Sequence, residues 1–258
     1  AFAALLTYQR NSSRRLFELA IVDRLFTAGT ISDRVANELY ASALREPLAK
    51  DWTVDPVETL TVILTPTFAP LERWFEVALQ RKEIERVFEI ADLIRRRRFY
   101  STLPMAGRLL ALRWVLEADS EMLTGQARQQ RQALLTRYPR YAELARRAAA
   151  IRQTLQTEPL LPNDEAGRRQ QSGLLAELDS LSQQQELMLR EIAVRRVPSE
   201  FLFPPPLDFK RVQAALPDKT LVLTFLVTSR SVYGMGFAKD TYTPTPLWLV
   251  QAPARVGK

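Results

Sequence analysis

Residues 220–228 read TLVLTFLVT, and this stretch decides what kind of domain the C-terminal part of the chain forms. It is apolar, β-branched and of strand length, which predicts a buried β-strand. A tight turn at 229–230 leads into a second predicted strand over 231–238, and a third follows at 247–250 after a proline-containing loop at 240–246. Three consecutive strands do not make a domain alone, so further strands or covering helices are required.

The sequence before this sheet predicts where the helical part of the chain ends. Pro198 and the prolines at 204–206 cannot lie inside a helix and interrupt the helical pattern. Residues 208–215 then predict a short amphipathic helix, and Leu-Pro-Asp at 216–218 predicts a turn into the first strand. A sheet-based domain therefore begins near Pro204.

Upstream, apolar residues recur every three or four positions, which predicts helices joined by short connections. Gly29 is expected to end the first helix and Ser32 to begin the second, so that the two form a helical hairpin. Pro66 and Pro70 predict a loop, and Trp114, in the last of these helices, is assigned to packing. The predicted helices cover residues 14–26, 32–45, a segment opening at 51–56 and continuing to 64, 71–79, 84–103 and 108–116.

The predicted hairpin over 71–79 and 84–103 resembles a tetratricopeptide repeat. Trp74 is followed by the apolar Val77 and the small Ala78, and the second helix has small residues at its packing face. No regular 34-residue repeat is visible upstream, so an irregular helical array is an equally open interpretation. Both arrangements stack helical hairpins into a concave surface suited to a peptide or a partner protein.

Two long polar helices are predicted over 126–155 and 166–194, joined by turn-forming residues at 158–164. The second has a heptad seam with one polar member, formed by Leu174, Leu178, Leu181, Gln185, Met188 and Ile192. The simplest interpretation is an antiparallel hairpin that folds back along itself. A coiled coil with a separate partner chain is the alternative.

The composition excludes several classes of active site. The 258 residues include no histidine and no cysteine. Disulfides, thiolate or histidine metal sites, and Ser–His or Cys–His nucleophiles are therefore excluded. Neither G-x-x-x-x-G-K-[ST] nor G-x-G-x-x-G occurs, so no phosphate-binding loop is expected. We predict no catalytic residue, no metal ligand and no cofactor site within this chain.

The net charge of +7, from 36 Lys+Arg against 29 Asp+Glu, raises the question of an anionic partner. The densest basic run, RRRR at 95–98, lies in a helical pattern, where four successive side chains point in four directions. Solvated faces and local ion pairs therefore explain the run better than a phosphate track does. Nucleic-acid binding, which predicts an affinity falling steeply with salt, is the weakest interpretation.

A few carboxylates and glycines could be proposed as acid–base or phosphate-binding residues, but each has a simpler explanation. Glu186, Glu191 and the pairs Asp51/Asp55 and Glu83/Glu85 are interpreted as ordinary solubilising carboxylates, because nothing places them in a shared pocket. The two aspartates flank a predicted helix start. Gly234 and Gly236 form a lone G-x-G within a strand, which predicts close backbone packing or a bulge rather than a phosphate site.

The sequence contains no pattern for membrane insertion or export. No run of about 18 apolar residues occurs, and no basic–apolar–small signal pattern follows Ala1. We therefore expect a cytoplasmic location without a membrane partner. A strand-like hairpin precedes the last residues without a terminating element, so we expect the chain to be a segment of a longer polypeptide.

Three stretches together resemble bacterial CHAT-domain proteins, caspase-like modules usually preceded by tetratricopeptide repeats. Residues 88–99 (FEIADLIRRRRF) resemble the Arg-rich helix that closes the repeat array, and a long polar helical hairpin follows, as in that family. Residues 212–225 (VQAALPDKTLVLTF) are similar to the beginning of the family's domain, with a helix, a Leu-Pro-acidic-x-Thr turn and an apolar strand containing an aromatic. Residues 231–237 resemble its second strand, and Trp248 with Val250 its third.

This resemblance, over about residues 70–258, implies a mainly α chain in three segments. They are a tetratricopeptide-like helical-repeat region (1–118), a long polar helical, coiled-coil-like connector (119–198) and the truncated N-terminal part of a caspase-like α/β domain (204–258). In the family, a cysteine thiolate attacks the peptide carbonyl and a histidine handles the protons. The dyad is expected downstream of Lys258; otherwise the protein has lost it and is a pseudo-enzyme.

The expected function is therefore partner recognition by the array, coupled to a cysteine peptidase domain of which this chain, inactive alone, holds the first strands. A protein or peptide bound to the array would shift the peptidase toward its active state, through the long hairpin. A non-enzymatic helical adaptor that binds a protein partner is the alternative. The sequence leaves the substrate, the partner and the oligomeric state open.

Overall fold

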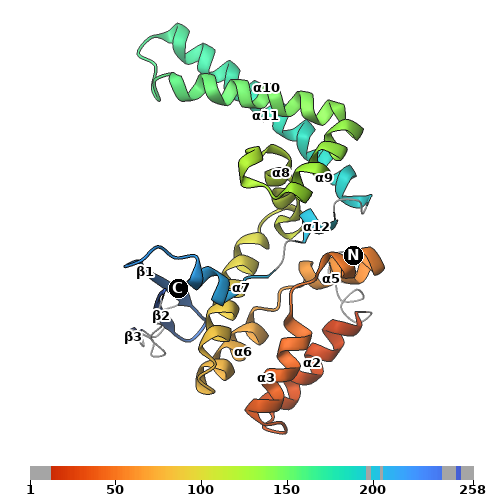
Figure 1. The fold of residues 1–258 in the computed structure, drawn as a ribbon, viewed down its shortest axis with the longest axis vertical. Helices are drawn as coiled ribbons and strands as arrows, with labels where there is room; N and C mark the ends of the chain where they lie inside the picture. The colour runs from red at the N-terminus through yellow and green to blue at the C-terminus, as the bar shows by residue number, and fades with distance from the viewer. Residues whose placement is uncertain (1–12, 196–198, 204–205, 240–247, 251–258) are drawn as a thin grey trace. The chain divides into compact units, whose positions relative to one another are not determined.

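A computed structural model of the chain is mainly helical, with a small antiparallel sheet in its C-terminal part (Figure 1). It divides into two compact units, one formed by residues 1–106 together with 205–258 and the other by residues 107–204. The sheet thus belongs to the same unit as the helical array, whereas the sequence placed them in separate segments. The structure describes residues 13–195, 199–203, 206–239 and 248–250.

The first unit contains the helical array and the sheet. Its helices are α2 (Arg14–Thr27), α3 (Asp33–Leu44), α4 (Ala49–Val54), α5 (Pro56–Leu64), α6 (Phe68–Gln80), α7 (Ile84–Tyr100) and α13 (Phe209–Ala214). Its strands are β1 (Leu221–Val227), β2 (Val232–Ala238) and β3 (Trp248–Val250). The hairpins α2–α3 and α6–α7 stack through α3 and α6, with α4 and α5 between them in the chain.

The second unit consists of helices. They are α8 (Arg108–Glu117), the 3-10 turn η2 (Ser120–Met122), α9 (Gly125–Arg137), α10 (Pro139–Thr157), α11 (Glu165–Val194) and α12 (Ser199–Leu202). The 3-10 turn η1 (Pro104–Gly107) precedes α8.

Local signals set several helix ends as predicted. Gly29 adopts φ +68°, and its amide donates to Phe26 O at 2.9 Å just after α2. Ser32 is the N-cap residue of α3. The Asp55 carboxylate accepts from the Glu58 amide at 3.0 Å and caps α5, which begins with a proline. The predicted glycine stop, the serine start and the aspartate at a helix start are confirmed.

Two predicted boundaries are wrong for a common reason, the position of a proline. The helix expected over 126–155 is two helices, because Pro139 occupies the first position of α10 and separates it from α9. Pro70, expected in a loop, lies in the first turn of α6, where a missing N–H is tolerated.

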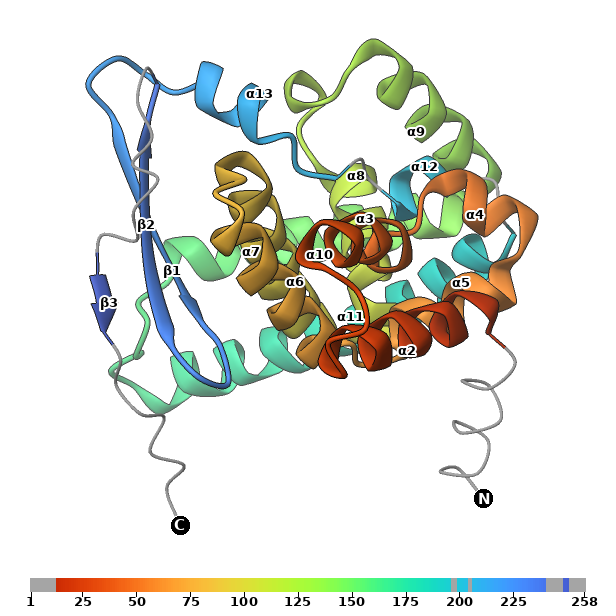
Figure 2. The ribbon, with the colours of Figure 1, turned by 90° about the horizontal axis from the view of Figure 1, so that it is seen from below.

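The sheet packs on α6, α7 and α13, and Figure 2 shows β1 and β2 beside these helices. β1 pairs with β2 from Leu221 opposite Ala238 to Val227 opposite Val232, and β2 pairs with β3. The register is continuous, so the two strand glycines form no bulge between β1 and β2. The inner face of the sheet belongs to the main core of this unit through Leu226, Tyr233, Met235 and Phe237.

Aromatic rings form the centre of the contact between sheet and helices. Phe88 of α7 stacks on Phe209 of α13, with ring centroids 4.6 Å apart, and meets Phe237 of β2 edge-on at 5.0 Å. Phe75 of α6 meets Tyr233 of β2 at 4.9 Å. Such pairs add specific geometry to apolar burial, so the array and the sheet share one core.

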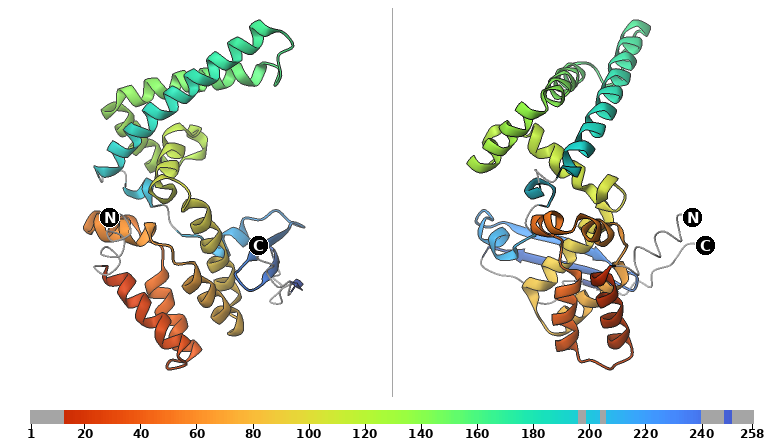
Figure 3. Two further views of the ribbon diagram at one scale, coloured as in Figure 1. Left: turned by 180° about the vertical axis from the view of Figure 1, so that it is seen from behind. Right: turned by 90° about the vertical axis from the view of Figure 1, so that its right-hand side faces the viewer.

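In the second unit, α10 and α11 run side by side as the predicted antiparallel hairpin (Figure 3). Leu144, Ala148, Ile151 and Leu181 form its buried cluster. Gln185, the polar member of the seam, is fully buried and donates to Glu117 Oε1 at 2.9 Å, which also accepts from the Tyr141 hydroxyl at 2.7 Å. Burial and the neighbouring Glu117 raise the pKa of Tyr141.

Trp114 was assigned to packing, and this prediction is wrong. Its side chain is 51% exposed, because α8 buries the face that carries Leu109, Leu112 and Leu116 instead. Among the helices that the structure describes, none combines the length and the apolar character that crossing a membrane requires. The predicted proline-containing loop at 240–246, Pro198 and Pro204 lie outside the described residues.

Candidate functional site

A cleft of about 590 Å³ opens in the first unit between α3, α7 and the segment that leads into α13. We call it the α3–α7 cleft. Its apolar lining consists of Ala41, Leu48, Trp74, Ile90, Leu93, Pro206 and Leu207. Its charged lining consists of Arg45, Glu46, Arg86, Glu89, Arg96, Asp208 and Arg211. A cavity of this size that combines apolar and charged side chains has the character of a binding site.

Trp74 is held in the cleft by a buried polar chain. Its indole Nε1 donates to Asn37 Oδ1 at 2.9 Å, and Asn37 Nδ2 donates to Glu83 Oε2 at 2.8 Å. This chain links α6, α3 and the N-terminal end of α7. Burial acts to raise the pKa of Glu83, but hydrogen bonds from Arg81 and Asn37 and the charge of Arg86 outweigh it and lower the pKa. Asn37 therefore fixes the orientation of the tryptophan.

The four arginines at 95–98 point to different elements, as predicted for successive helical residues. Arg96 pairs with Glu46 at 2.7 Å and with Asp92 at 2.6 Å. Arg97 donates to Leu44 O at 3.3 Å, at the C-terminal end of α3. Arg95 and Arg98 reach β1 instead. The prediction of local ion pairs and separate directions is confirmed, and the run forms no continuous basic stripe.

Arg95 and Arg98 bind the outer edge of β1. The Thr228 amide donates to Ser231 O at 2.8 Å, so the even-numbered residues of β1 direct their backbone groups toward β2 and the odd-numbered ones toward the free edge. Arg95 donates to Phe225 O at 3.2 Å and also to the Thr224 hydroxyl, and Arg98 donates to the Val227 carbonyl. The two arginines thus cap the edge carbonyls that another strand would need.

Glu72 of α6 completes this contact by binding the β1–β2 turn. It is 7% exposed and accepts from Arg98 Nη2 at 2.5 Å, from the Ser229 amide at 2.9 Å and from the Ser229 hydroxyl at 2.5 Å. We call Glu72, Arg98 and Ser229 the turn latch. A buried carboxylate with three donors is a well-satisfied acceptor, so the latch fixes the sheet against α6 and α7.

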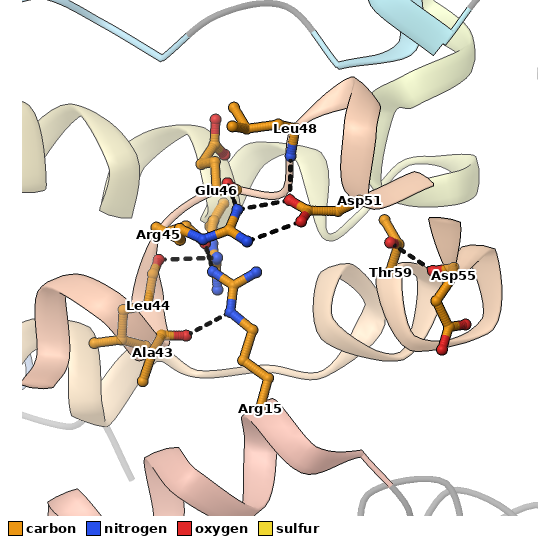
Figure 4. A network of polar contacts seen from close by, with 10 residues as sticks. Arg15, Ala43, Leu44, Arg45, Glu46, Leu48, Asp51, Asp55 and Thr59 are labelled. Atoms are coloured by element: carbon orange, nitrogen blue, oxygen red, sulfur yellow. Dashed lines mark hydrogen bonds and ion pairs between the residues drawn. The ribbon is translucent and has the colours of Figure 1, made fainter. Parts of the chain in front are cut away.

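The C-terminal end of α3, beside the cleft, is capped by arginines (Figure 4). Arg15 donates to Ala43 O at 2.9 Å and also to the Arg45 carbonyl. Arg45 makes a bidentate pair with Asp51 at 2.6 and 2.8 Å, and Asp51 accepts from the Leu48 amide at 2.8 Å. Cations at a helix C-terminus are stabilising. Burial, together with the charge of Arg45, lowers the pKa of Arg15 to about 10.

The rim of the cleft carries charges of both signs, because Glu89 and Asp208 lie in the same lining as Arg86 and Arg211. Arg211 is exposed on α13 and has no acidic partner among the described residues. Arg86 has one acidic partner there, Glu83, at 3.5 Å. Arg45 and Arg96, by contrast, are paired. Burial raises the pKa of Glu89, which faces the cleft and accepts weakly from the Phe209 amide at 3.4 Å.

The carboxylates considered from sequence do not converge on one site. Asp51 and Asp55 cap α4 and α5, and Glu83 begins α7. Glu85 pairs with Lys210 at 3.3 Å, and the remaining two, Glu186 and Glu191, form i,i+4 pairs with arginines on α11. Within the described parts of the chain, no group of three acidic residues is placed to hold a metal ion.

Gly234 and Gly236 lie opposite Phe225 and Leu223 in the sheet, where the missing side chains leave room for the larger ones. Sequence reasoning missed Arg86 and Arg211 as cleft residues, and Asn37 as the residue that orients Trp74. Trp74 and the stretch 88–99 were singled out from the sequence, but no pattern linked them to α13, which lies more than a hundred residues further along the chain.

Comparisons of the chain with known protein families, with curated proteins and with solved structures found no match. The geometry of the first unit is therefore what bears on function.

Proposed function

We propose that the chain is the partner-recognition array and the N-terminal portion of a CHAT-type, caspase-like cysteine peptidase. Its His/Cys dyad would be supplied by residues downstream of Lys258, and the array would be built of tetratricopeptide-like repeats. The protein would act in the cytoplasm. One observation supports the proposal. The sheet packs one of its faces on α7, the helix that closes the array, and the other face, on β1, is apolar and exposed.

The open face is formed by alternate residues of β1. Leu221, Leu223, Phe225 and Val227 are each more than half exposed within the described parts of the chain. A strand that is apolar on both faces is typical of a sheet covered by helices on both sides, as in α/β domains. The open face thus supports membership of a larger α/β domain, as the resemblance to CHAT proteins implies.

The geometry also supports a direct route of coupling between partner and peptidase. On α7, Ile90 and Leu93 line the cleft, whereas Phe88, Arg95 and Arg98 contact the sheet and α13. At 3.6 residues per turn these two sets lie on opposite faces of the helix. A ligand in the cleft that shifts α7 would therefore shift the sheet as well. This route differs from the coupling through the long hairpin that the sequence suggested.

Reading the open frame beyond the codon for Lys258, and expressing the chain to its end, tests the proposal. The expected frame continues with a histidine and a cysteine after apolar strands, and replacing that cysteine by alanine abolishes cleavage of peptide substrates. A complete protein without this pair, or peptidase activity that survives the replacement, contradicts it. The array's role is tested by limited proteolysis and by peptidase assays with and without a partner; unchanged activity on binding contradicts coupling.

A non-enzymatic helical adaptor is the second candidate. It is favoured by the α3–α7 cleft itself, which is complete in the first unit and requires no catalytic residue. A complete protein that lacks histidine and cysteine, yet binds a partner through Arg86 and Arg211, would establish this function instead.

A further inference from the structure

The first strand of the sheet has the composition of a strand that pairs with copies of itself. Residues 220–228 (TLVLTFLVT) contain no charged residue, no proline and no glycine. Uncharged segments of this kind, with high β-propensity, associate edge to edge when they are accessible. In the part of the sheet that the structure describes, the strand order is β1-β2-β3, so β1 is an edge strand. The protein therefore needs a means of keeping this edge closed.

The free edge of β1 is also complementary to itself. Leu221, Leu223, Phe225 and Val227 direct their backbone groups toward this edge, because the even-numbered residues bond to β2. An antiparallel copy related by a twofold axis at Thr224 would place Leu223 opposite Phe225 and Leu221 opposite Val227. All four side chains lie on the exposed face of the sheet, so the pairing would join apolar residues with apolar residues.

Two arginines of α7 occupy this edge. Arg95 donates to Phe225 O at 3.2 Å and also to the Thr224 hydroxyl, and Arg98 donates to the Val227 carbonyl. In the antiparallel pairing, these two carbonyls would accept hydrogen bonds from amides of the second copy. Guanidinium groups of the same molecule engage both acceptors instead, and they hold positive charge beside an otherwise uncharged strand.

We propose that Arg95 and Arg98 keep the β1 edge closed against β1 of a second copy of the chain. The run at 95–98 divides its four side chains between two tasks. Arg96 and Arg97 bind residues at the end of α3, whereas Arg95 and Arg98, three positions apart on the helix, face the sheet together. This inference does not depend on the proposed function, because a peptidase and an adaptor would need the closed edge alike.

The test removes the two arginines and compares self-association. The open-edge variant is Arg95→Ala with Arg98→Ala. The matched control is Arg190→Ala with Arg195→Ala, which loses the same charge from exposed i,i+4 pairs on α11. Arg95→Ala alone keeps the pair of Arg98 with Glu72, so it opens part of the edge and leaves the turn latch in place. Circular dichroism and urea denaturation check that each variant folds.

A proline at position 223 tests whether the edge itself is the site of association. The Leu223 amide points away from β2, so Leu223→Pro removes a donor from the free edge and none from the pairing with β2. The blocked variant adds this change to the open-edge variant. Amide exchange followed by NMR gives a second readout in the open-edge variant. The Leu223 and Phe225 amides should gain protection on association, whereas the Thr224 and Leu226 amides, which already bond to β2, should not.

The open-edge variant is expected to associate in sedimentation velocity, with an association constant at least about tenfold above that of wild type and of the control. Arg95→Ala alone is expected to lie between wild type and the open-edge variant, and the blocked variant is expected to behave as wild type. Association of either arginine variant no stronger than that of the control overturns the proposal. Association that persists in the blocked variant, or that leaves the Leu223 and Phe225 amides unprotected, overturns it as well.

Discussion

Removing the carboxylate of the turn latch should release the sheet from the array without unfolding the second unit. Glu72→Ala deletes the acceptor of three hydrogen bonds and leaves Arg98 and the Ser229 amide without it. Breaking a buried ion pair from one side costs about 3–5 kcal/mol. The Arg98 side chain is 35% exposed, so water compensates in part. We therefore expect the low end of this range, about 3 kcal/mol.

Hydrogen exchange measured by mass spectrometry resolves this loss by region. A local loss of about 3 kcal/mol speeds exchange of the β1–β2 amides about 10²-fold, since each 1.36 kcal/mol is a factor of ten. Peptides from α10 and α11 serve as an internal control. Glu186→Ala, which removes an exposed i,i+4 pair, is the matched variant and should change exchange by less than about threefold. Exchange in β1–β2 that matches wild type, or an equal rise in α10–α11, would refute the latch.

Three further changes test other parts of the structure. Arg45 holds the pKa of Asp51 at about 2, below its ordinary value of 3.8, so the stability that this pair contributes is present above pH 3.8 and lost as the pH falls toward 2. In an acid titration followed by circular dichroism, the helical signal of Asp51→Asn should therefore decline less below pH 4 than that of wild type. Identical curves would contradict this role of Asp51. Phe88→Ala should destabilise the first unit by about 3–5 kcal/mol in urea denaturation, through loss of the aromatic cluster; a loss below about 1 kcal/mol would place the core elsewhere. Tyr141→Phe should cost about 1–2 kcal/mol in the second unit, because Glu117 loses a buried donor; an unchanged unfolding midpoint would show that the network is replaceable.

Local patterns in the sequence predicted much of the secondary structure and little of its assembly. The stop at Gly29, the start at Asp55 and a strand within 220–228 depend on a few neighbouring residues, and these predictions are confirmed. The burial predicted for that strand is wrong, because alternate residues from Leu221 to Val227 are more than half exposed. The break at Pro139 was missed because the helical pattern continues on both sides of it, and a proline is tolerated at the first position of a helix.

Local sequence patterns could not predict the cleft or the turn latch. Arg95 and Thr224 are 129 positions apart, and no periodicity links them. The direction of each arginine in the 95–98 run followed from helix geometry, but its partner did not. Glu72 gave no signal at all, because a carboxylate within an apolar helix reads as a solvent-exposed residue until the turn that it binds is known.

The insertion of residues 107–204 within the first unit has a consequence for synthesis on the ribosome. At about 5–20 residues per second, the roughly one hundred residues of the insertion take about 5–20 s to emerge. During this interval α6 and α7 are complete, but Phe75 and Phe88 have no sheet to cover them. The nascent chain therefore exposes an aromatic surface until β2 has been made, and we expect chaperones that bind apolar segments to recognise it in this interval.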